Sequence, residues 1–359
     1  MSDPRTPNGG AEAKPAPLYS LAGKRVWVAG HGGMVGSALV ERLKSENCEV
    51  QIANRQRVDL RRQQLVEAWL ARHRPQAIFL AAARVGGINA NNTRPAEFIY
   101  DNLMIAANII GAAPSFGVEK LLFLGSSCVY PKFAPQPITE DALLTGPLEP
   151  TNQWYAVAKI AGAQLCQAFR AQYGCDFITA MPTNLYGPGD NFDLSSSHAL
   201  PALIAKAHRA KVEGADELVV WGTGKPRREF LHVHDAADAL VFLMKHYSDS
   251  ALINVGVGED ISIADLARLV ADVVGFRGRL RYDTSMPDGT PRKLLDVSRL
   301  SAMGWGPRIT LRAGIQQTYE WYLKHHAEVG DDSPPAAARG PAGDVRASAD
   351  TASPSWEAR

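Results

Sequence analysis

Apolar residues in the first half of the chain alternate between short continuous runs and longer stretches with helical spacing. The short runs predict strands buried on both faces, and the longer stretches predict helices that cover them. Strands that alternate with helices are typical of a doubly wound parallel sheet of the Rossmann type, in the α/β class. The predicted strands are 25–29, 49–53, 77–81, 120–125 and 177–181, and the predicted helices are 37–45, 60–73, 96–113 and 155–173.

The pattern changes after Pro182. Residues 184–190 predict a loop, because the segment contains Asn, Pro and two glycines. Short strands are predicted at 218–221 and 280–282. Helices are predicted at 198–209, 235–246, 262–274 and 311–324, with Asp235 and Ser262 near their N-caps.

This change of pattern predicts a smaller α/β part against the carboxyl edge of the sheet. Ligands bind in the crevice that such an edge forms. The expected division is a flexible extension at 1–20, a Rossmann part at 21–183 with a return segment near 228–258, a substrate-binding part at 184–227 and 259–328, and a disordered tail at 329–359.

The composition excludes several classes of protein. The 359 residues are 46% hydrophobic and carry a net charge of +1, without a basic stripe, so we expect no nucleic-acid partner. No apolar stretch has the length of a membrane span, and residues 1–20 lack the apolar core of a secretion signal. The four cysteines form no metal-ligand spacing, so we expect no metal and reduced thiols in the cytoplasm.

A Gly-rich turn follows the first predicted strand, with Gly30, Gly33 and Gly36 ahead of a predicted helix. Glycines permit a tight turn and allow a pyrophosphate to approach the backbone at a helix N-terminus. The turn therefore predicts a dinucleotide site, although an ordinary strand-to-helix turn can also be rich in glycine.

Tyr155 and Lys159 lie one helical turn apart on the same face of a predicted helix. A neighbouring ammonium favours the phenolate, so we expect Lys159 to lower the pKa of Tyr155. Such a phenol can protonate a carbonyl oxygen during reduction. Ser126, at the end of the fourth predicted strand, can supply a hydroxyl to the same oxygen. Tyr-x-x-x-Lys alone occurs by chance, but Ser126 and the Gly-rich turn strengthen the interpretation.

The second predicted strand ends without the acidic residue that usually binds the ribose hydroxyls of NAD. Arg55 and Arg57 offer cations instead, which suits the 2′-phosphate of NADP. Both arginines could equally be solvated loop residues. Asp59 either faces the adenine or caps the next helix.

Longer motifs resemble the extended short-chain dehydrogenase/reductases and, within them, the GDP-L-fucose synthases. The resemblance covers about residues 23–324. Its motifs are Gly30-His-Gly-Gly-Met-Val-Gly-Ser-Ala38, Leu80-Ala-Ala-Ala-Arg-Val-Gly-Gly-Ile88, Ala90-Asn-Asn-Thr93, Leu124-Gly-Ser-Ser-Cys-Val-Tyr-Pro131, Met181-Pro-Thr-Asn-Leu-Tyr-Gly-Pro188, Arg228-Glu-Phe-Leu-His-Val233 and Pro287-Asp-Gly-Thr-Pro-Arg-Lys-Leu-Leu-Asp-Val297.

The resemblance implies a homodimer that epimerises C3 and C5 of GDP-4-keto-6-deoxy-D-mannose and reduces C4 with NADPH, giving GDP-L-fucose. It implies Ser126, Tyr155 and Lys159 for reduction, and Cys128 and His198 for the proton transfers. Where the family commonly has Arg in the Gly-rich turn, this chain has Gly32, which weakens the implied preference for NADPH.

The residues and the resemblance together give two sets of predicted contacts. The cofactor set is Gly30, Gly33, Met34, Val35, Gly36, Arg55, Arg57, Asp59, Ala81, Ala82, Ala83, Lys159, Pro182, Asn184, Leu185 and His198. The substrate set is Asn184, Lys206, Trp221, Arg228 and Asp288.

Plainer interpretations exist for several of these residues. Cys128 could be a packing residue, whereas epimerisation needs a base, for which a thiolate of lowered pKa is suitable. His198 could be a surface residue or a helix cap, and Trp221 a core residue. Arg228 could form an ion pair with Glu229 or Asp235. Asn184 could stabilise its own loop rather than donate to a substrate phosphate.

Two other functions fit the same motifs. A nucleotide-sugar 4-epimerase or 4,6-dehydratase has this scaffold, but a dehydratase needs a carboxylate near Ser126, where the chain has Ser127 and Cys128. A non-catalytic NADP-sensing protein is the remote alternative. Such a protein typically lacks the Tyr or the Lys of the pair.

Overall fold

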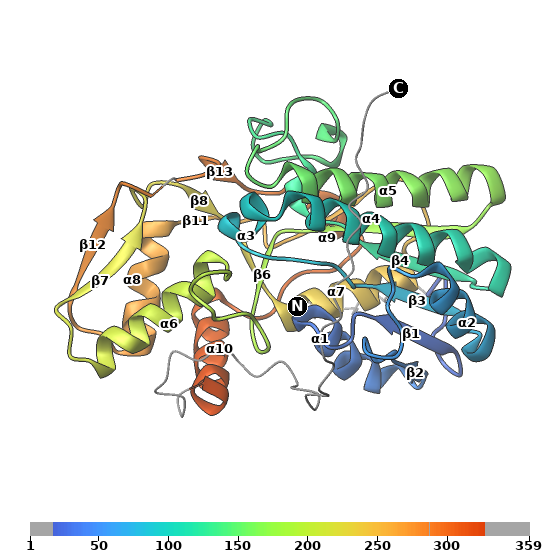
Figure 1. The fold of residues 1–359 in the computed structure, drawn as a ribbon, viewed down its shortest axis with the longest axis horizontal. Coiled ribbons are helices and arrows are strands. Elements are labelled where there is room, and N and C mark those ends of the chain that lie inside the picture. Colours follow the sequence, from blue (N-terminus) through green and yellow to red (C-terminus); the bar gives the residue numbers. More distant parts are fainter. Residues whose placement is uncertain (1–16, 287, 327–359) are drawn as a thin grey trace, which may run out of the picture.

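A computed structural model describes residues 17–286 and 288–326. Its centre is a six-stranded parallel sheet in the order β10-β5-β4-β3-β1-β2 (Figure 1). The Rossmann-type fold predicted from the alternating pattern is therefore confirmed. The strands are β1 (Arg25–Ala29), β2 (Glu49–Gln51), β3 (Ala77–Leu80), β4 (Lys120–Leu124), β5 (Asp176–Pro182) and β10 (Ile253–Val255).

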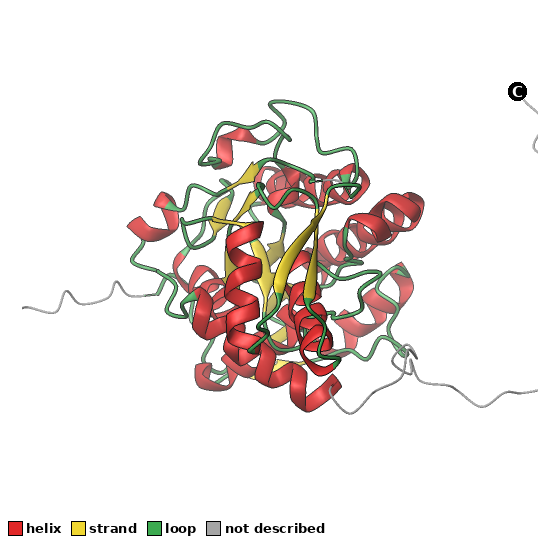
Figure 2. Cartoon of the chain, turned by 90° about the vertical axis from the view of Figure 1, so that its left-hand side faces the viewer, coloured by secondary structure: helices red, strands yellow, loops and turns green. Residues whose placement is uncertain are grey.

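Helices cover both faces of this sheet (Figure 2). Val26 and Val28 of β1 pack with α1 (Met34–Leu43) and α7 (Val233–His246). Trp27, between them, packs on the other face with α2 (Gln63–His73), α4 (Pro95–Ala112) and α5 (Gln153–Tyr173). Since successive side chains of a strand point to opposite faces, the continuous apolar run follows directly from this burial.

A separate hydrophobic cluster forms the core of the smaller part. There α6 (Ala199–Val212), α8 (Ile263–Val274) and α10 (Leu311–His326) surround a parallel pair, β7 (Glu217–Trp221) and β12 (Arg279–Asp283), at the left of Figure 1. Between this core and the large sheet lie β6 (Asn184–Tyr186) paired with β9 (Phe230–His232), and a sheet of β11 (Ile261–Ser262), β8 (Arg227–Arg228) and β13 (Arg292–Lys293).

Several elements differ from the sequence prediction. Residues 184–186, predicted as loop, form β6, because they pair in parallel with β9. The sixth strand β10 and the short helices α3 (Ile88–Thr93) and α9 (Ser298–Ala302) were not predicted, and neither were the 3₁₀ helices. Such short elements carry too few residues for a periodic pattern. The 3₁₀ helices are Lys44–Glu46, Ala113–Phe116, Ser127–Val129 and Glu140–Ala142.

The two predicted N-caps have different outcomes. Ser262 caps α8, since its side chain accepts a hydrogen bond from the backbone N–H of Asp265 at 3.0 Å. Asp235 is not the cap of α7, which is His232. The buried Asp235 carboxylate instead accepts the backbone N–H groups of Arg308 and Ile309. Asp235 therefore fixes the segment before α10.

The chain ends are described only in part. The backbone N–H of Tyr19 donates to the carbonyl of Lys245, and its hydroxyl donates to Glu119 at 2.9 Å. The predicted flexible extension therefore does not reach residue 20. Residues 1–16 and the predicted tail at 329–359 lie outside the described residues. None of the described helices is long and apolar enough to cross a membrane.

Candidate active site

The Gly-rich turn lies where β1 and β3 end side by side. Gly30 has a φ of +98°, and a Cβ placed there would lie 2.6 Å from the backbone N of Ala82. A Cβ on Gly36 would lie 2.0 Å from the carbonyl oxygen of Gly30. Only glycine fits these two positions, so the start of α1 and the end of β3 can approach closely.

This turn has the geometry of a dinucleotide site. Gly33 is the N-cap of α1, which begins at Met34 and Val35, and no side chain caps its free N–H groups. The chain runs from β1 to β2 on one side and then returns to β3 on the other side of β1. The strand order therefore reverses at this point. Parallel sheets bind ligands at such a point, and a helix N-terminus attracts phosphate. Three more predicted cofactor positions, Ala81, Ala82 and Ala83, directly follow β3.

The loop after β2 presents two cations. Arg55 and Arg57 are both exposed, and neither forms an ion pair among the described residues. Asp59 instead pairs with Arg61 at 2.8 Å, which holds the pKa of Asp59 at about 2. Helix α2 begins at Gln63 with Arg62 as its N-cap, so the interpretation of Asp59 as a helix cap is wrong.

Tyr155, Lys159 and Ser126 come together between α5 and the end of β4. The Lys159 ammonium donates to the carbonyl of Leu124 at 2.7 Å and lies 5.8 Å from the centre of the Tyr155 ring. Ser126 caps the 3₁₀ helix that follows β4, accepting the backbone N–H of Cys128 at 3.2 Å. The hydroxyl of Ser126 also lies close enough to Tyr155 to lower its pKa.

The expected effect of Lys159 on Tyr155 is wrong for this structure. Burial raises the pKa of Tyr155, and the nearby Cys128 raises it further. Burial also lowers the pKa of Lys159 to about 7. The ammonium is directed at the carbonyl of Leu124, and its own charged form is disfavoured by desolvation, so it contributes little to the phenol.

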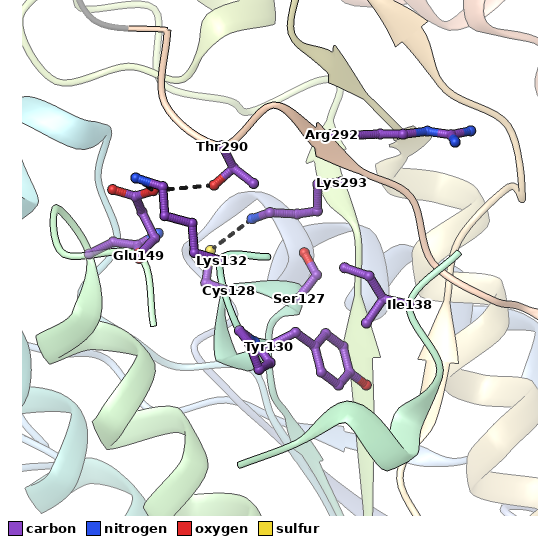
Figure 3. A pocket seen from close by; sticks show the side chains of 11 residues that line it. Ser127, Cys128, Tyr130, Lys132, Ile138, Glu149, Thr290, Arg292 and Lys293 are labelled. Carbon is purple, nitrogen blue, oxygen red and sulfur yellow. Dashed lines mark hydrogen bonds and ion pairs between the residues drawn. The ribbon is translucent and has the colours of Figure 1, made fainter. Parts of the chain in front are cut away.

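Cys128 has the most distinctive thiol of the chain. The ammonium of Lys293 donates to its Sγ at 3.5 Å (Figure 3). Burial would raise the pKa of Cys128, but Lys293, Ser126 and Arg228 outweigh burial and lower it. Burial raises the pKa of the other three thiols, Cys48, Cys166 and Cys175. Cys128 is also only partly buried, unlike a typical packing cysteine.

His198 begins α6 as its N-cap residue, and its ring does not cap the helix. The walls of the crevice lower the pKa of His198 by desolvation, and the charge of Lys293 lowers it further, although the residue remains open to solvent. The loop before it is held by a hydrogen bond from the backbone N–H of Gly87 to the carbonyl of Ser196 at 2.8 Å. Lys293 therefore acts electrostatically on both Cys128 and His198.

The predicted substrate residues lie mostly in the smaller part. The Lys206 ammonium lies 4.2 Å from the centre of the Trp221 ring. Trp221 is 48% exposed, which rules out the core interpretation. Asp288 accepts the backbone N–H of Thr223 at 2.7 Å and its hydroxyl at 2.8 Å, so Asp288 fixes the loop after β7.

Arg228 and Asn184 contact backbone carbonyls. The Arg228 guanidinium donates to the carbonyl of Arg227 and forms no ion pair with Glu229 or Asp235, whose carboxylates bind backbone N–H groups. Burial lowers the pKa of Arg228. The amide of Asn184 donates to the carbonyl of Glu229 at 2.7 Å, so it fixes a distant segment rather than its own loop.

Sequence reasoning missed two residues of this site, Lys293 and Glu229. Both lie inside motifs that resemble the family. The sequence around a charged residue next to a turn does not indicate which group that residue contacts. Two residues of the predicted cofactor set remain. Pro182 is the last residue of β5, and Leu185 lies within β6. The described residues contain no group of three His, Cys, Asp or Glu side chains that could hold a metal.

Comparisons with known proteins agree with this architecture. Residues 26–256 match the model of the NAD dependent epimerase/dehydratase family. A GDP-L-fucose synthase of Sinorhizobium fredii is 60% identical over 312 residues, covering 87% of this chain and 99% of that protein. A GDP-L-fucose synthase of Escherichia coli is 50% identical over 315 residues, covering 85% and 98%.

A solved structure gives the same result. A GDP-L-fucose synthetase from Naegleria fowleri, bound to NADP, has a TM-score of 0.79 and 30% identity, covering 87% of this chain and 98% of that chain. The chain therefore belongs to the NAD dependent epimerase/dehydratase family, within the GDP-L-fucose synthases of the extended short-chain dehydrogenase/reductases.

Proposed function

We propose that this protein is a bifunctional enzyme that converts GDP-4-keto-6-deoxy-D-mannose to GDP-L-fucose, by 3,5-epimerisation followed by NADPH-dependent reduction at C4. The observation that carries the proposal is the meeting of two sets of groups in one crevice. Cys128 has a lowered pKa beside Lys293, and Tyr155 with Ser126 lies next to it. The relatives of known structure and name support the substrate and the cofactor.

The epimerisation is assigned to Cys128 and His198. The C4 ketone makes the protons at C3 and C5 acidic, because the enolate oxygen is stabilised by hydrogen-bond donors such as Ser126 and Tyr155. The Cys128 thiolate removes a proton from one face of the sugar, and His198 supplies a proton to the opposite face. Lys293 favours the Cys128 thiolate, which is the form that removes a proton. It also lowers the pKa of His198, so the protonated imidazole is a stronger acid toward the sugar carbon.

The reduction is assigned to Tyr155, Ser126 and Lys159. The bound cofactor supplies the hydride to C4. Tyr155 donates a proton to the C4 oxygen, and the hydroxyl of Ser126 holds that oxygen by a hydrogen bond. The high pKa of Tyr155 keeps the phenol protonated and ready to donate. The Lys159 ammonium lies near the Tyr155 ring and is held there by its hydrogen bond to the carbonyl of Leu124.

The glycine turn fits the cofactor, because Gly30 and Gly36 leave room that a Cβ would fill. We assign Arg55 and Arg57 to the 2′-phosphate of NADP(H), and the rest of the predicted cofactor set to the surrounding contacts. Both arginines are exposed, and neither pairs with an acid in the part of the chain that the structure describes, which leaves them available to a phosphate.

The substrate assignment uses the smaller part. Arg228 suits the diphosphate, since its guanidinium lies close enough to Cys128 and Asp288 for their charges to interact, and its planar set of N–H donors matches phosphate oxygens. Trp221, with Lys206 over its ring, offers a flat exposed surface to the nucleotide. Asn184 and Asp288 contribute by fixing neighbouring backbone, in addition to the contacts expected of them.

The rival functions find less support. A 4,6-dehydratase needs a carboxylate beside Ser126, and the nearby acid Glu149 is paired with Lys132 at 2.9 Å. A 4-epimerase without net reduction makes no use of a thiol with a lowered pKa. A non-catalytic sensor makes no use of the Tyr155–Lys159 pair.

A homodimer and a cytoplasmic location complete the proposal. The packed helices α4 and α5 expose the apolar side chains of Tyr100, Trp154 and Val157, which suits contact with a second copy of the chain. The four free thiols suit a reducing compartment. We also retain the division into a cofactor-binding and a substrate-binding part, with the boundaries given above.

One assay tests the proposed function. The protein is supplied with NADPH and a panel of 4-keto and non-keto GDP- and UDP-sugars, and NADPH absorbance is followed. We expect oxidation only with GDP-4-keto-6-deoxy-D-mannose, with GDP-L-fucose as the product. Turnover of non-keto sugars without NADPH loss would favour a 4-epimerase, and no turnover of any sugar would favour the sensor.

A further inference from the structure

Glu229 is a fully buried carboxylate that has no cationic partner among residues 17–286 and 288–326. It lies between β8 and β9 and has 0% exposure. One carboxylate oxygen accepts the backbone N–H groups of Val257 and Gly258 at 2.6 and 2.7 Å, and the other accepts that of Leu295 at 3.0 Å. A buried charge is costly unless it is satisfied, so three N–H donors on one side chain indicate a specific structural task.

These bonds join separate segments of the chain. Val257 and Gly258 follow β10, the edge strand of the large sheet, whereas Leu295 follows β13. The backbone N–H of Glu229 also donates to the carbonyl of Lys293 at 3.3 Å. A Cβ on Gly256 would lie 2.3 Å from a carboxylate oxygen of Glu229, so the chain leaves room for this side chain.

The segment that Glu229 holds carries Lys293. Strand β13 contains only two residues, and Lys293 lies opposite Arg228 in its pairing with β8. Beyond this short pairing, the backbone of Ile138 bonds to Leu294 and Asp296 on the same segment. The bond from Leu295 to Glu229 adds a side-chain anchor two residues after Lys293. The Lys293 ammonium reaches Cys128 from this segment (Figure 3).

We propose that Glu229 is a positioning residue whose carboxylate holds the β13 segment so that the Lys293 ammonium stays against the sulfur of Cys128. The consequence for turnover depends on the proposed function, but the contact itself does not. If Glu229 only stabilised the fold, its loss would lower the melting temperature without a specific change in the chemistry of one thiol.

The charged and titratable groups around Cys128 make the thiol a readout for this contact. Lys293 from β13, Arg228 from β8 and Tyr155 from α5 act on the sulfur, and Lys293 also acts on His198. Displacing Lys293 removes the nearest of these cations. The thiolate fraction at neutral pH then falls, and with it the rate of alkylation.

The test compares the pH dependence of Cys128 alkylation in the full chain and in Glu229→Gln. Gln keeps the size of the side chain but can direct an N–H₂ group at a backbone N–H. Iodoacetamide is the probe, and peptide mass spectrometry separates Cys128 from the other three thiols. We expect alkylation of Cys128 at pH 7 to slow by about tenfold, from the loss of one nearby charge.

Two further variants show whether Glu229 acts through Lys293. Lys293→Gln should slow alkylation by the same factor, and the double variant should be no slower than either single variant. Lys132→Gln is the matched control: Lys132 lies near Cys128 but pairs with Glu149, so its loss should leave alkylation unchanged. NADPH affinity, measured in the same samples, should remain that of the wild type.

The proposal is overturned if Cys128 in Glu229→Gln is alkylated with the wild-type pH dependence. It is also overturned if the alkylation rate of the double variant falls by the product of the two single-variant factors. Should Glu229→Gln fail to fold, Glu229→Asp replaces it, since a shorter carboxylate cannot reach both segments. The assay contains no sugar nucleotide, so its result is independent of whether the protein makes GDP-L-fucose.

Discussion

The large parallel sheet and the small β8–β11–β13 sheet hold the side chains of the site in different ways. In the large sheet, Phe79 of β3 and its neighbours have 0% exposure, and both faces are covered by helices. In the small sheet each strand has two residues, and the buried carboxylates of Glu229 and Asp260 hold the segments together. Asp260 pairs with Arg227 at 2.7 Å.

Two kinds of interaction therefore position the side chains of one crevice. Apolar burial fixes the cofactor side, so the fold there should tolerate substitutions at exposed positions such as Arg55. Polar contacts fix the small β8–β11–β13 sheet at the substrate side, where Lys293 reaches Cys128. A substitution in the apolar core should therefore lower the stability of the whole protein, whereas one in the polar contacts should change individual steps of the reaction.

The largest expected effect comes from Phe79→Ala in the large sheet. Phe79 is fully buried, so its loss should lower the free energy of unfolding by about 3–5 kcal/mol. Denaturant unfolding measures the change. Val212→Ala, at a position 71% exposed, is the control and should change stability little. A small effect of Phe79→Ala would remove the claim that apolar burial fixes the cofactor side.

Arg228→Met addresses the substrate side. A charged hydrogen bond to phosphate contributes about 1.5–3 kcal/mol, so the KM for the GDP-sugar should rise roughly tenfold to a hundredfold. NADPH affinity should not change. Steady-state kinetics and fluorescence titration of NADPH measure the two effects. Lys225 is exposed in the preceding turn, so Lys225→Met serves as the control. An equal rise in the KM of Lys225→Met for the GDP-sugar would contradict a specific role for Arg228.

Replacing both Arg55 and Arg57 with Ala tests the exposed loop that follows β2 of the large sheet. NADPH binding should weaken by roughly tenfold or more, because two cations facing the 2′-phosphate are lost. NADH binding should change far less, and the melting temperature should stay constant. Titrations with both cofactors give the ratio. Equal losses for NADPH and NADH would remove the assignment to the 2′-phosphate.

Lys206→Met should give the smallest effect. A cation–π contact at a half-exposed ring contributes about 0.5–1 kcal/mol, so the KM for the GDP-sugar should rise by a few fold. The kcat should remain close to that of the wild type, because Lys206 lies outside the proton-transfer groups. A large fall in kcat with unchanged KM would show that the two sides of the crevice are coupled more strongly than we infer.

The same contrast explains how much the sequence predicts. Strands β1 to β5 of the large sheet, and the helices α1, α2, α4, α5 and α7 that cover it, follow from continuous or periodic apolar patterns. The spacing of Tyr155 and Lys159 on one helix, with Ser126 at the end of a strand, predicted that the three lie together, and the structure places them at the end of β4. The predicted lowering of the pKa of Tyr155 failed, because spacing along a helix does not give the burial of either side chain.

The substrate side was harder to predict. Strands of two residues have no period, so β8, β11 and β13 left no pattern. The contact between Lys293 and Cys128 joins residues 165 positions apart, which no local rule connects. The role of Asp235 was mistaken for a helix cap, since an acid at a helix start has the same pattern whether it caps its own helix or binds another segment.

The central claim is that Cys128 with His198 performs proton exchange at carbon, while Tyr155 performs reduction. Mass spectrometry of the GDP-sugar in heavy water, alongside NADPH absorbance, tests it in Cys128→Ala and Tyr155→Phe. Cys128→Ala should lose deuterium uptake by about 100- to 10,000-fold while keeping NADPH affinity. Tyr155→Phe should still take up deuterium, more slowly, but hardly oxidise NADPH.

The wild-type protein adds a pH criterion to this measurement. A thiol with a lowered pKa loses its base form only when the pH falls through that pKa, so deuterium uptake should decline on acidification. The account predicts that Cys128→Ala keeps only that residual uptake and loses this pH dependence. Uptake by Cys128→Ala at the wild-type rate would show that Cys128 is a packing residue and that another group is the base.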